Sequence, residues 1–125
     1  MRVYYAHFMG IYNTPQEERD IKTLEALGLE VLNPNTPDIQ KEVDLWKNIL
    51  NYMDMFEEVF LKRVRSCDVF AFRGLPNGRI PGGVAMELKA AKEAGRIIIE
   101  LPCSTISRSM DGEETREYLM DMGQR

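Results

Sequence analysis

Residues 81–91 have the sequence Pro-Gly-Gly-Val-Ala-Met-Glu-Leu-Lys-Ala-Ala, a glycine-containing loop that leads directly into a helix. The predicted helix begins near Gly83, and its inward stripe is formed by Val84, Leu88, Ala91 and Gly95. At about 100° per residue, Glu87 lies beside this stripe, and Ala91 at i+4 provides no cation for it. A glutamate in a first turn often serves only the helix macrodipole. The inward position favours instead a carboxylate that faces a cleft.

Strands and helices alternate along the chain on both sides of this segment. Strands are predicted over 2–6, 29–32, 68–72 and 96–101, and helices over 14–28, 37–67 with an interruption, 83–95, and within 111–122. The Ile97-Ile98-Ile99 run is typical of a strand covered on both faces. The alternation predicts a three-layer α/β/α domain with a parallel sheet of strand order 2-1-3-4. In such a sheet, ligands bind where the strand order reverses, here between the first and third strands.

The helical segment 37–67 carries two apolar rows. The expected core row is Leu45, Ile49, Met53, Phe56, Phe60 and Val64, and the second row is Trp46, Tyr52, Met55 and Val59. A helix that is apolar on more than one face usually packs against something beyond its own sheet. This pattern predicts a homodimer or a higher homo-oligomer, although a covering C-terminal segment would serve equally well.

Length, charge and cysteine use restrict the class of protein. The 125 residues fit a single domain, 1–125, and the net charge of −4 argues against a nucleic-acid partner while leaving room for a small anionic ligand. No stretch is long enough to span a membrane, and the N-terminus does not resemble a signal peptide. Cys67 and Cys103 match no metal spacing, and His7 is the only histidine, so no metal site is expected. Both cysteines are expected to be buried free thiols in a reducing cytoplasm.

Two tyrosines are expected beside the cleft. Tyr4 and Tyr5 point to opposite faces of the first strand, so one can reach towards Glu87 while the other packs in the core. Tyrosines in a strand are more often core residues, but their place at its carboxyl end favours a role in the site. The loop 74–83 lacks the Lys-Ser or Lys-Thr pair of a P-loop, so an ATPase mechanism is not expected. No cofactor is expected either.

Basic groups around the cleft are the candidate ligand contacts. His7 follows the first strand, while Arg73 and Arg79 flank the loop before the predicted helix. Gly82 and Gly83 would add backbone donors at the helix N-terminus. Exposed arginines and a structural histidine are the ordinary alternatives. If these groups do meet, a 5′-monophosphate is expected to bind more tightly than the corresponding nucleoside.

Three short segments resemble a known family. They are Tyr4-Tyr5-Ala6, the predicted strand Ser66-Cys67-Asp68-Val69-Phe70-Ala71, and Gly83-Val84-Ala85-Met86-Glu87-Leu88 with Ala91. Over roughly residues 1–102 the chain is similar to the nucleoside 2-deoxyribosyltransferase superfamily, including its 2′-deoxynucleoside 5′-monophosphate N-glycosidase branch. The resemblance implies a flavodoxin-like (Rossmann-like), usually oligomeric fold. It also implies that Glu87 attacks the anomeric carbon of a deoxyribose and that Tyr4 hydrogen-bonds this carboxylate.

The chain departs from the family pattern at two acidic positions. Phe60 stands where the family commonly has an aspartate, and Pro81 stands at a second acidic position; Glu57, one turn before Phe60, is a candidate replacement. His7 replaces a small residue of the family. Three interpretations therefore remain: an N-glycosidase or transferase, which also needs a proton donor for the departing base, a non-catalytic nucleotide-binding protein, and an interaction module built on the apolar helix.

Overall fold

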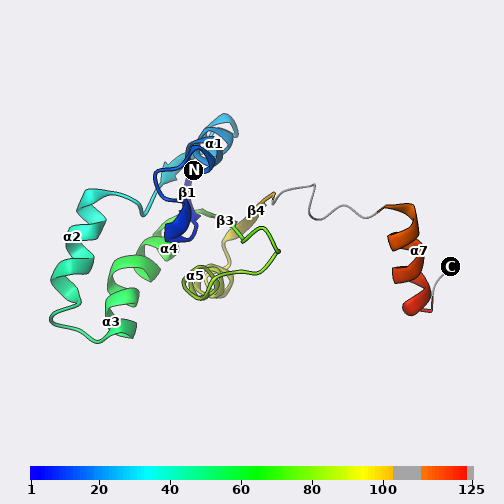
Figure 1. The fold of residues 1–125 in the computed structure, drawn as a ribbon. Helices are drawn as coiled ribbons and strands as arrows, with labels where there is room; N and C mark the ends of the chain where they lie inside the picture. Colours follow the sequence, from blue (N-terminus) through cyan, green and yellow to red (C-terminus); the bar gives the residue numbers. More distant parts are fainter. Residues whose placement is uncertain (103–110, 124–125) are drawn as a thin grey trace.

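A parallel four-stranded sheet forms the centre of the computed structural model, which describes residues 1–102 and 111–123 (Figure 1). The strands are β1 (Arg2–Ala6), β2 (Glu30–Leu32), β3 (Val69–Arg73) and β4 (Ile97–Leu101), in the order β2-β1-β3-β4. Tyr4 of β1 lies opposite Leu32 on one side and Phe70 on the other. The predicted strand order is confirmed, and the order reverses at β1, beside β3.

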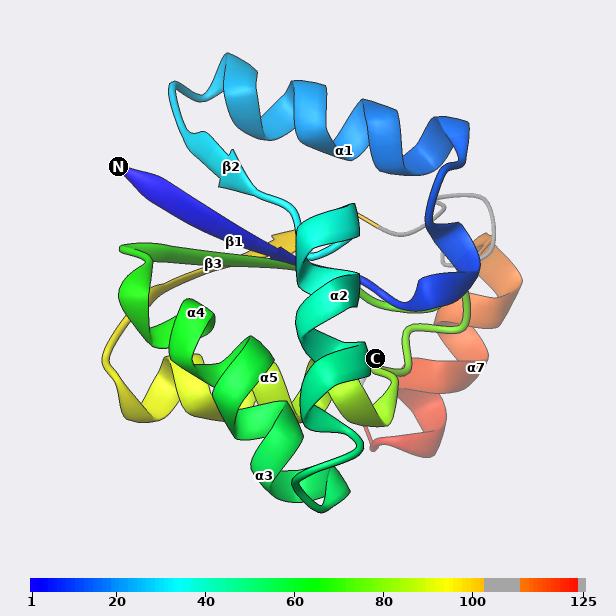
Figure 2. The ribbon, with the colours of Figure 1, turned by 90° about the vertical axis from the view of Figure 1, so that its left-hand side faces the viewer.

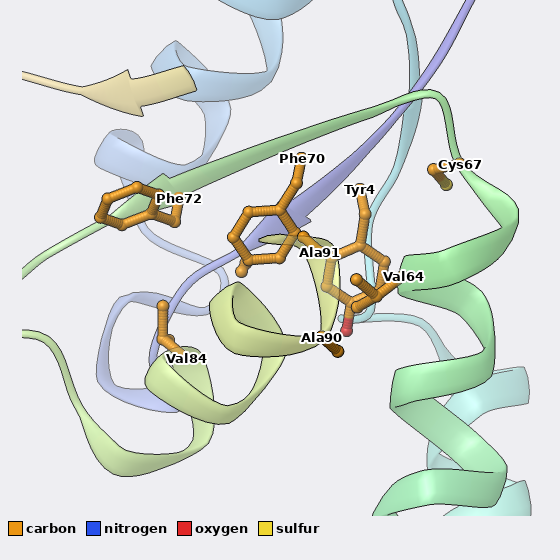
Figure 3. Close-up of a cluster of buried hydrophobic side chains, with 9 residues drawn as sticks. Tyr4, Val64, Cys67, Phe70, Phe72, Val84, Ala90 and Ala91 are labelled. Atoms are coloured by element: carbon orange, nitrogen blue, oxygen red, sulfur yellow. The ribbon is translucent and has the colours of Figure 1, made fainter. Parts of the chain in front are cut away.

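Helices cover both faces of the sheet. α1 (Pro15–Ala26) packs on one face, and α4 (Lys62–Ser66) and α5 (Gly82–Glu93) pack on the other (Figure 2). Because successive side chains of a strand alternate between faces, Tyr4 belongs to the buried cluster on the α4 and α5 side (Figure 3) and Tyr5 to the cluster on the α1 side. The three-layer α/β/α architecture is confirmed.

Local sequence signals explain where α1 begins and ends. The Thr14 side chain accepts a hydrogen bond from the Glu17 backbone N–H, and Pro15 occupies the first helical position, where no donor is needed. Gly28, with a φ of +81°, lies just beyond the end of the helix in a conformation that favours glycine. The same logic applies to α5, which is followed by Gly95 at a φ of +71°.

The expected core row in the segment 37–67 is wrong in its first half. α2 (Pro37–Trp46) ends, Asn51 caps a new start, and α3 (Tyr52–Phe56), a π-helical turn η2 (Glu57–Leu61) and α4 then follow without a break. The predicted interruption is therefore confirmed. Because the helix is interrupted, the side chains before and after the interruption do not face the same side. Leu45, Ile49 and Met53 are more than half exposed, while Met55, Phe56, Val59 and Val64 are buried.

The outer elements differ from expectation in one detail. Among the described strands, β4 lies at the edge of the sheet and pairs with β3 alone. Ile97 is 54% exposed, while Ile98 and Ile99 pack on opposite faces. The predicted C-terminal helix is present as α7 (Gly112–Asp121), which has no buried residue and stands apart from the sheet in Figure 1. None of the described helices has the length and apolar character needed to cross a membrane. Cys67 is a buried free thiol, and Cys103 lies outside the described residues.

Candidate active site

A buried tyrosine in the middle of β1 and a buried glutamate of α5 meet on one face of the sheet. The Tyr4 hydroxyl donates a hydrogen bond to Oε2 of Glu87, and Tyr4 is fully buried while Glu87 is 6% exposed. Glu87 lies in the second turn of α5 rather than in the first, because the helix already begins at Gly82. This position removes the simple macrodipole explanation, whose effect is confined to the first turn.

The environment of Glu87 favours its protonated form. Burial raises the pKa of Glu87 to about 7, and the hydrogen bond from Tyr4 lowers it only in part. No cation among the described residues contributes to this pKa. The pKa of Tyr4 is raised in turn, by burial and by the neighbouring Glu87, so its hydroxyl stays a hydrogen-bond donor. The pair thus contains a carboxyl group with a pKa near neutral pH. Catalytic acids and bases commonly have pKa values in this range.

Glu87 and Tyr4 line a cavity of about 450 Å³. Its volume lies within the range of small-molecule sites, about 300–1,000 Å³. Most of the wall is apolar: it consists of Phe8, Met9, Pro34, Ile39, Val43, Met55, Phe56, Phe60, Pro81, Gly83 and Val84. The polar part of the wall is made by Tyr4, His7, Tyr12, Gln40, Tyr52 and Glu87. A largely apolar ligand with a few polar groups fits this composition.

His7 lines the cavity, but its two ring nitrogens are already engaged. Nδ1 lies 3.1 Å from the Tyr5 carbonyl oxygen and Nε2 lies 2.7 Å from Oε2 of Glu17. Its ring stacks on Tyr5 with centroids 3.8 Å apart. Burial raises the pKa of Glu17, but hydrogen bonds from His7, Asn35 and the Asn13 backbone lower it to a net value below the ordinary one. The structure therefore gives His7 the role of a fixed wall rather than of a free ligand contact.

Tyr12 is a cavity residue that sequence reasoning missed. It follows the short 3₁₀ turn η1 (Met9–Ile11), and its ring contacts His7 at a centroid distance of 4.7 Å. Burial, together with the charges of Glu87 and Glu17, raises the pKa of Tyr12 to about 12. Tyr12 lies in an irregular loop, so no periodic pattern in the sequence marks it as a cavity residue. The one available signal was that tyrosines stand on both sides of the loop after β1.

Arg73 lies on the opposite face of the sheet. Its Nε and Nη2 donate to the two carboxylate oxygens of Asp20 at 2.6 and 2.7 Å, and Nη1 donates to the Pro102 carbonyl oxygen at 2.6 Å. Tyr5 donates its hydroxyl to the same carboxylate at 2.5 Å. Arg73 therefore does not line the cavity and instead neutralises a buried aspartate.

The remaining predicted contacts are distributed unevenly. Gly83 lines the cavity, whereas Gly82 and the exposed Arg79 do not. A second cavity of about 310 Å³ shares Tyr12, Pro34 and Gln40 with the first. Within the described part of the chain, no arginine or lysine lines either cavity.

Phe60 and Pro81 both lie in the cavity wall, at the positions where the resemblance expects acidic residues. Phe60 belongs to the π-helical turn, a rare conformation that occurs often at functional sites. Glu57 does not replace the missing aspartate, because its carboxylate is bonded to Arg65 and it does not line the cavity. Residues 1–102 and 111–123 contain no cluster of three or more potential metal ligands.

Comparison with known proteins identifies the fold. Neither protein-family models nor curated protein sequences match the chain. Among solved structures, it is similar to a 2-deoxyribosyltransferase from Leishmania mexicana, with a TM-score of 0.50 and 15% sequence identity. The match covers 80% of this chain and 63% of that chain, so the chain spans less than two thirds of the neighbour's length. The chain has the nucleoside deoxyribosyltransferase-like fold that the short segments around Tyr4, Val69 and Glu87 predict.

Proposed function

We propose that the protein cleaves the N-glycosidic bond of a deoxynucleoside, with Glu87 as the nucleophile. The observation that carries this proposal is the pair of Tyr4 and Glu87 at the floor of a largely apolar cavity of about 450 Å³. A carboxylate next to an anomeric carbon can trap the oxocarbenium-like state as a glycosyl ester, which water or a second base then opens. The fold of a 2-deoxyribosyltransferase supports the same chemistry.

Each group of the pair has a distinct task in this scheme. The ionised form of Glu87 attacks the sugar carbon, and the bond from the glycosidic nitrogen breaks with its electron pair on the departing base. The Tyr4 hydroxyl holds the attacking carboxylate in one orientation through its hydrogen bond to Oε2. The apolar wall excludes water from the ionic transition state, which strengthens the electrostatic interactions inside the cavity.

The charges around the cavity favour an uncharged nucleoside over its 5′-monophosphate. The expected preference for the 5′-monophosphate depended on three basic groups beside the cavity. Arg73 is instead bound to Asp20, both ring nitrogens of His7 are engaged, and Arg79 does not line the cavity. Side-by-side titration of a deoxynucleoside and its monophosphate tests this preference. We expect the nucleoside to bind at least as tightly and Arg79→Ala to leave both affinities unchanged; a selective loss of monophosphate binding in that variant would contradict the assignment.

The activity is tested with a panel of deoxynucleosides, each with and without a second free base as acceptor. Release of free base, measured chromatographically, is expected from the parent protein and not from Glu87→Gln. The sugar product distinguishes the acceptors: free deoxyribose indicates hydrolysis, and a new nucleoside indicates transfer. Tight nucleoside binding without release of any base would favour the alternative, a non-catalytic nucleotide-binding protein on the same fold. The apolar Phe60 and Pro81 in the cavity wall support this alternative, because the family commonly has acidic residues there.

Assembly into a homodimer or a higher homo-oligomer forms a further part of the proposal. Four large side chains, those of Leu45, Ile49, Tyr52 and Met53, are more than half exposed around the turn between α2 and α3. Clustered apolar surface of this kind commonly marks a protein interface. Light scattering at micromolar concentration should give at least twice the monomer mass, and a monomer would contradict the prediction. The buried free thiol of Cys67 fits a reducing cytoplasm as the compartment.

A further inference from the structure

Some polar side chains of the main cavity are already hydrogen-bonded to other protein groups, and others are not. Tyr4 donates to Glu87, His7 is held by Glu17 and the Tyr5 carbonyl, and Gln40 donates to Asp44 at 3.1 Å. The Tyr12 hydroxyl has no hydrogen-bond partner within the described part of the chain. Tyr52 also lacks one, but it is 62% exposed, whereas Tyr12 is half-buried. Tyr12 is thus the sheltered cavity hydroxyl that is available to a ligand.

Tyr12 is also held in place before any ligand arrives. Its backbone N–H donates to the Met9 carbonyl at 3.1 Å, and its ring packs against His7 at an interplanar angle of 50°. His7 cannot turn away without losing its stacking on Tyr5 and its bond to Glu17. A donor fixed in this way costs little reorganisation when charge develops near it.

Among the described residues, the cavity wall offers few other groups that could assist a departing base: the Gln40 amide already donates to Asp44, and Tyr52 is 62% exposed. Glu87 is the only carboxyl group in the described cavity wall, and the proposed function uses it as the nucleophile. Phe60 and Pro81 supply no proton and no hydrogen bond. A base that leaves with the electron pair of the broken bond gains negative charge, and an unassisted departure is slow.

We propose that Tyr12 is a further catalytic residue, whose hydroxyl donates a hydrogen bond to the departing base. This inference rests on the proposed function. A carboxylate oxygen of Glu87 bonds to C1′ while the C1′–N bond breaks and its electron pair passes to the base, which the Tyr12 hydroxyl stabilises without giving up its proton. The released base takes a proton from water, and a water molecule or a second base opens the glycosyl ester and restores Glu87.

The acidity of Tyr12 agrees with a donor that keeps its proton. Its pKa of about 12 means that the hydroxyl is protonated throughout the neutral range. A phenol of this strength is too weak an acid for complete transfer to most nucleobase anions, but it is a full hydrogen-bond donor. His7 acts as a positioning residue in this arrangement, since its ring packs against Tyr12 and is itself held by Glu17.

Substrate pairs that differ in how readily the base leaves test this role. One pair is 2′-deoxyguanosine and 7-methyl-2′-deoxyguanosine, and the other is 2′-deoxyuridine and 5-fluoro-2′-deoxyuridine. The second member of each pair has the better leaving group, because 7-methylguanine leaves as a neutral base and the fluorine atom stabilises the uracil anion. Tyr12→Phe should lower kcat/KM on the first member by about ten- to a hundredfold, the value of a hydrogen bond to a charged group. On the second member we expect a clearly smaller loss, and Tyr118→Phe on α7, outside the cavity, should change neither.

The outcomes separate this inference from the proposed function. If the parent releases a base but Tyr12→Phe loses nothing, or loses equally on both members of a pair, the role of Tyr12 is overturned while that of Glu87 stands. If the parent releases no base from any deoxynucleoside of the panel, these four included, the proposed function fails and this inference fails with it. Should Tyr12→Phe not fold, 3-fluorotyrosine at position 12 keeps the ring and provides a stronger donor. It should then raise kcat/KM selectively on the first member of each pair, and an unchanged ratio would overturn the proposal.

Discussion

Two neighbouring tyrosines of β1 each donate a hydroxyl to a buried carboxyl group, on opposite faces of the same sheet. On the α1 face, Tyr5 donates to Asp20. The Asp20 carboxylate also accepts hydrogen bonds from Nε and Nη2 of Arg73 and from the side-chain amide of Gln16. On the α5 face, Tyr4 donates to Glu87, which lines a cavity and has no neighbouring cation among the described residues. The charge of Asp20 is neutralised by Arg73, and its carboxylate is enclosed by hydrogen-bond donors. Glu87 has neither feature among the described residues.

The difference shows how one motif supports two roles. A buried charge is tolerated when it is paired and fully hydrogen-bonded, and it then stabilises the fold without being reactive. A buried carboxyl group with a single donor costs folding energy when it ionises, but it remains free to react. We therefore expect changes at Asp20 to alter stability and changes at Glu87 to alter activity.

The largest expected effect is the loss of base release in Glu87→Gln. The amide is nearly isosteric and can still accept the Tyr4 hydrogen bond, but it cannot act as a nucleophile, so the rate should fall by more than about a thousandfold. The matched control is Asp20→Asn, which changes the same group on the other face and should keep the rate per folded molecule. Steady-state rates of free-base formation measure both. Equal rates for Glu87→Gln and the parent would remove Glu87 from the mechanism.

Breaking the closed cluster should cause the next largest effect. Asp20→Ala removes the carboxylate that accepts two hydrogen bonds from the Arg73 guanidinium, whose side chain is 12% exposed, and it also removes the acceptor of the Tyr5 hydroxyl. Loss of one partner of a buried ion pair typically costs about 3–5 kcal/mol of unfolding free energy. Urea denaturation measures this loss. A change below about 1 kcal/mol would mean that water replaces the cluster freely, contrary to its burial.

The open pair should behave in the opposite way, because ionisation of Glu87 costs stability. Its pKa of about 7 lies above the ordinary value of 4.5, so the folded state holds the proton more tightly than the unfolded chain does. This contribution is fully present below pH 4.5 and is lost as the pH rises through 7. At pH 8.5, Glu87→Gln should therefore be more stable than the parent by about 3 kcal/mol, and the gain should shrink towards pH 5. Urea denaturation across this range tests it, and a gain that does not vary with pH would contradict the burial argument.

The sequence was sufficient to predict most of the fold. Thr14 with Pro15, Gly28 and Gly95 are local signals, and local signals set the ends of α1 and α5. The alternation of strands and helices then leaves few topologies, and the order 2-1-3-4 is one of them. The convergence of the loops at the switch point of the sheet predicted that one of the two tyrosines would reach Glu87. That this tyrosine is Tyr4 was implied only by the resemblance to the deoxyribosyltransferase superfamily.

What the sequence could not supply were side-chain partners over long distances. Arg73 looks like a free cation in the sequence, and only the folded chain places Asp20, 53 residues away, against it. His7 and Glu17 are joined in the same way. The exposed Leu45, Ile49 and Met53 were misassigned to the core because a helical row was continued through a break and a π-helical turn that no periodicity reveals.

The smallest expected effect is that of Tyr4→Phe, which leaves Glu87 in place and removes its single donor. A hydrogen bond to a charged group is worth about 1.5–3 kcal/mol, so base release should fall by about ten- to a hundredfold, less than in Glu87→Gln.

The pH profile gives the sharper reading of Tyr4→Phe. The bond from Tyr4 lowers the pKa of Glu87, so its removal should move the rising limb of kcat/KM from about pH 7 to a higher pH. Tyr5→Phe on the other face should leave this limb where it is. A limb that stays at the same pH in both variants would show that Tyr4 does not control the ionisation of Glu87, and the distinction between the two pairs would then rest on the cation at Asp20 alone.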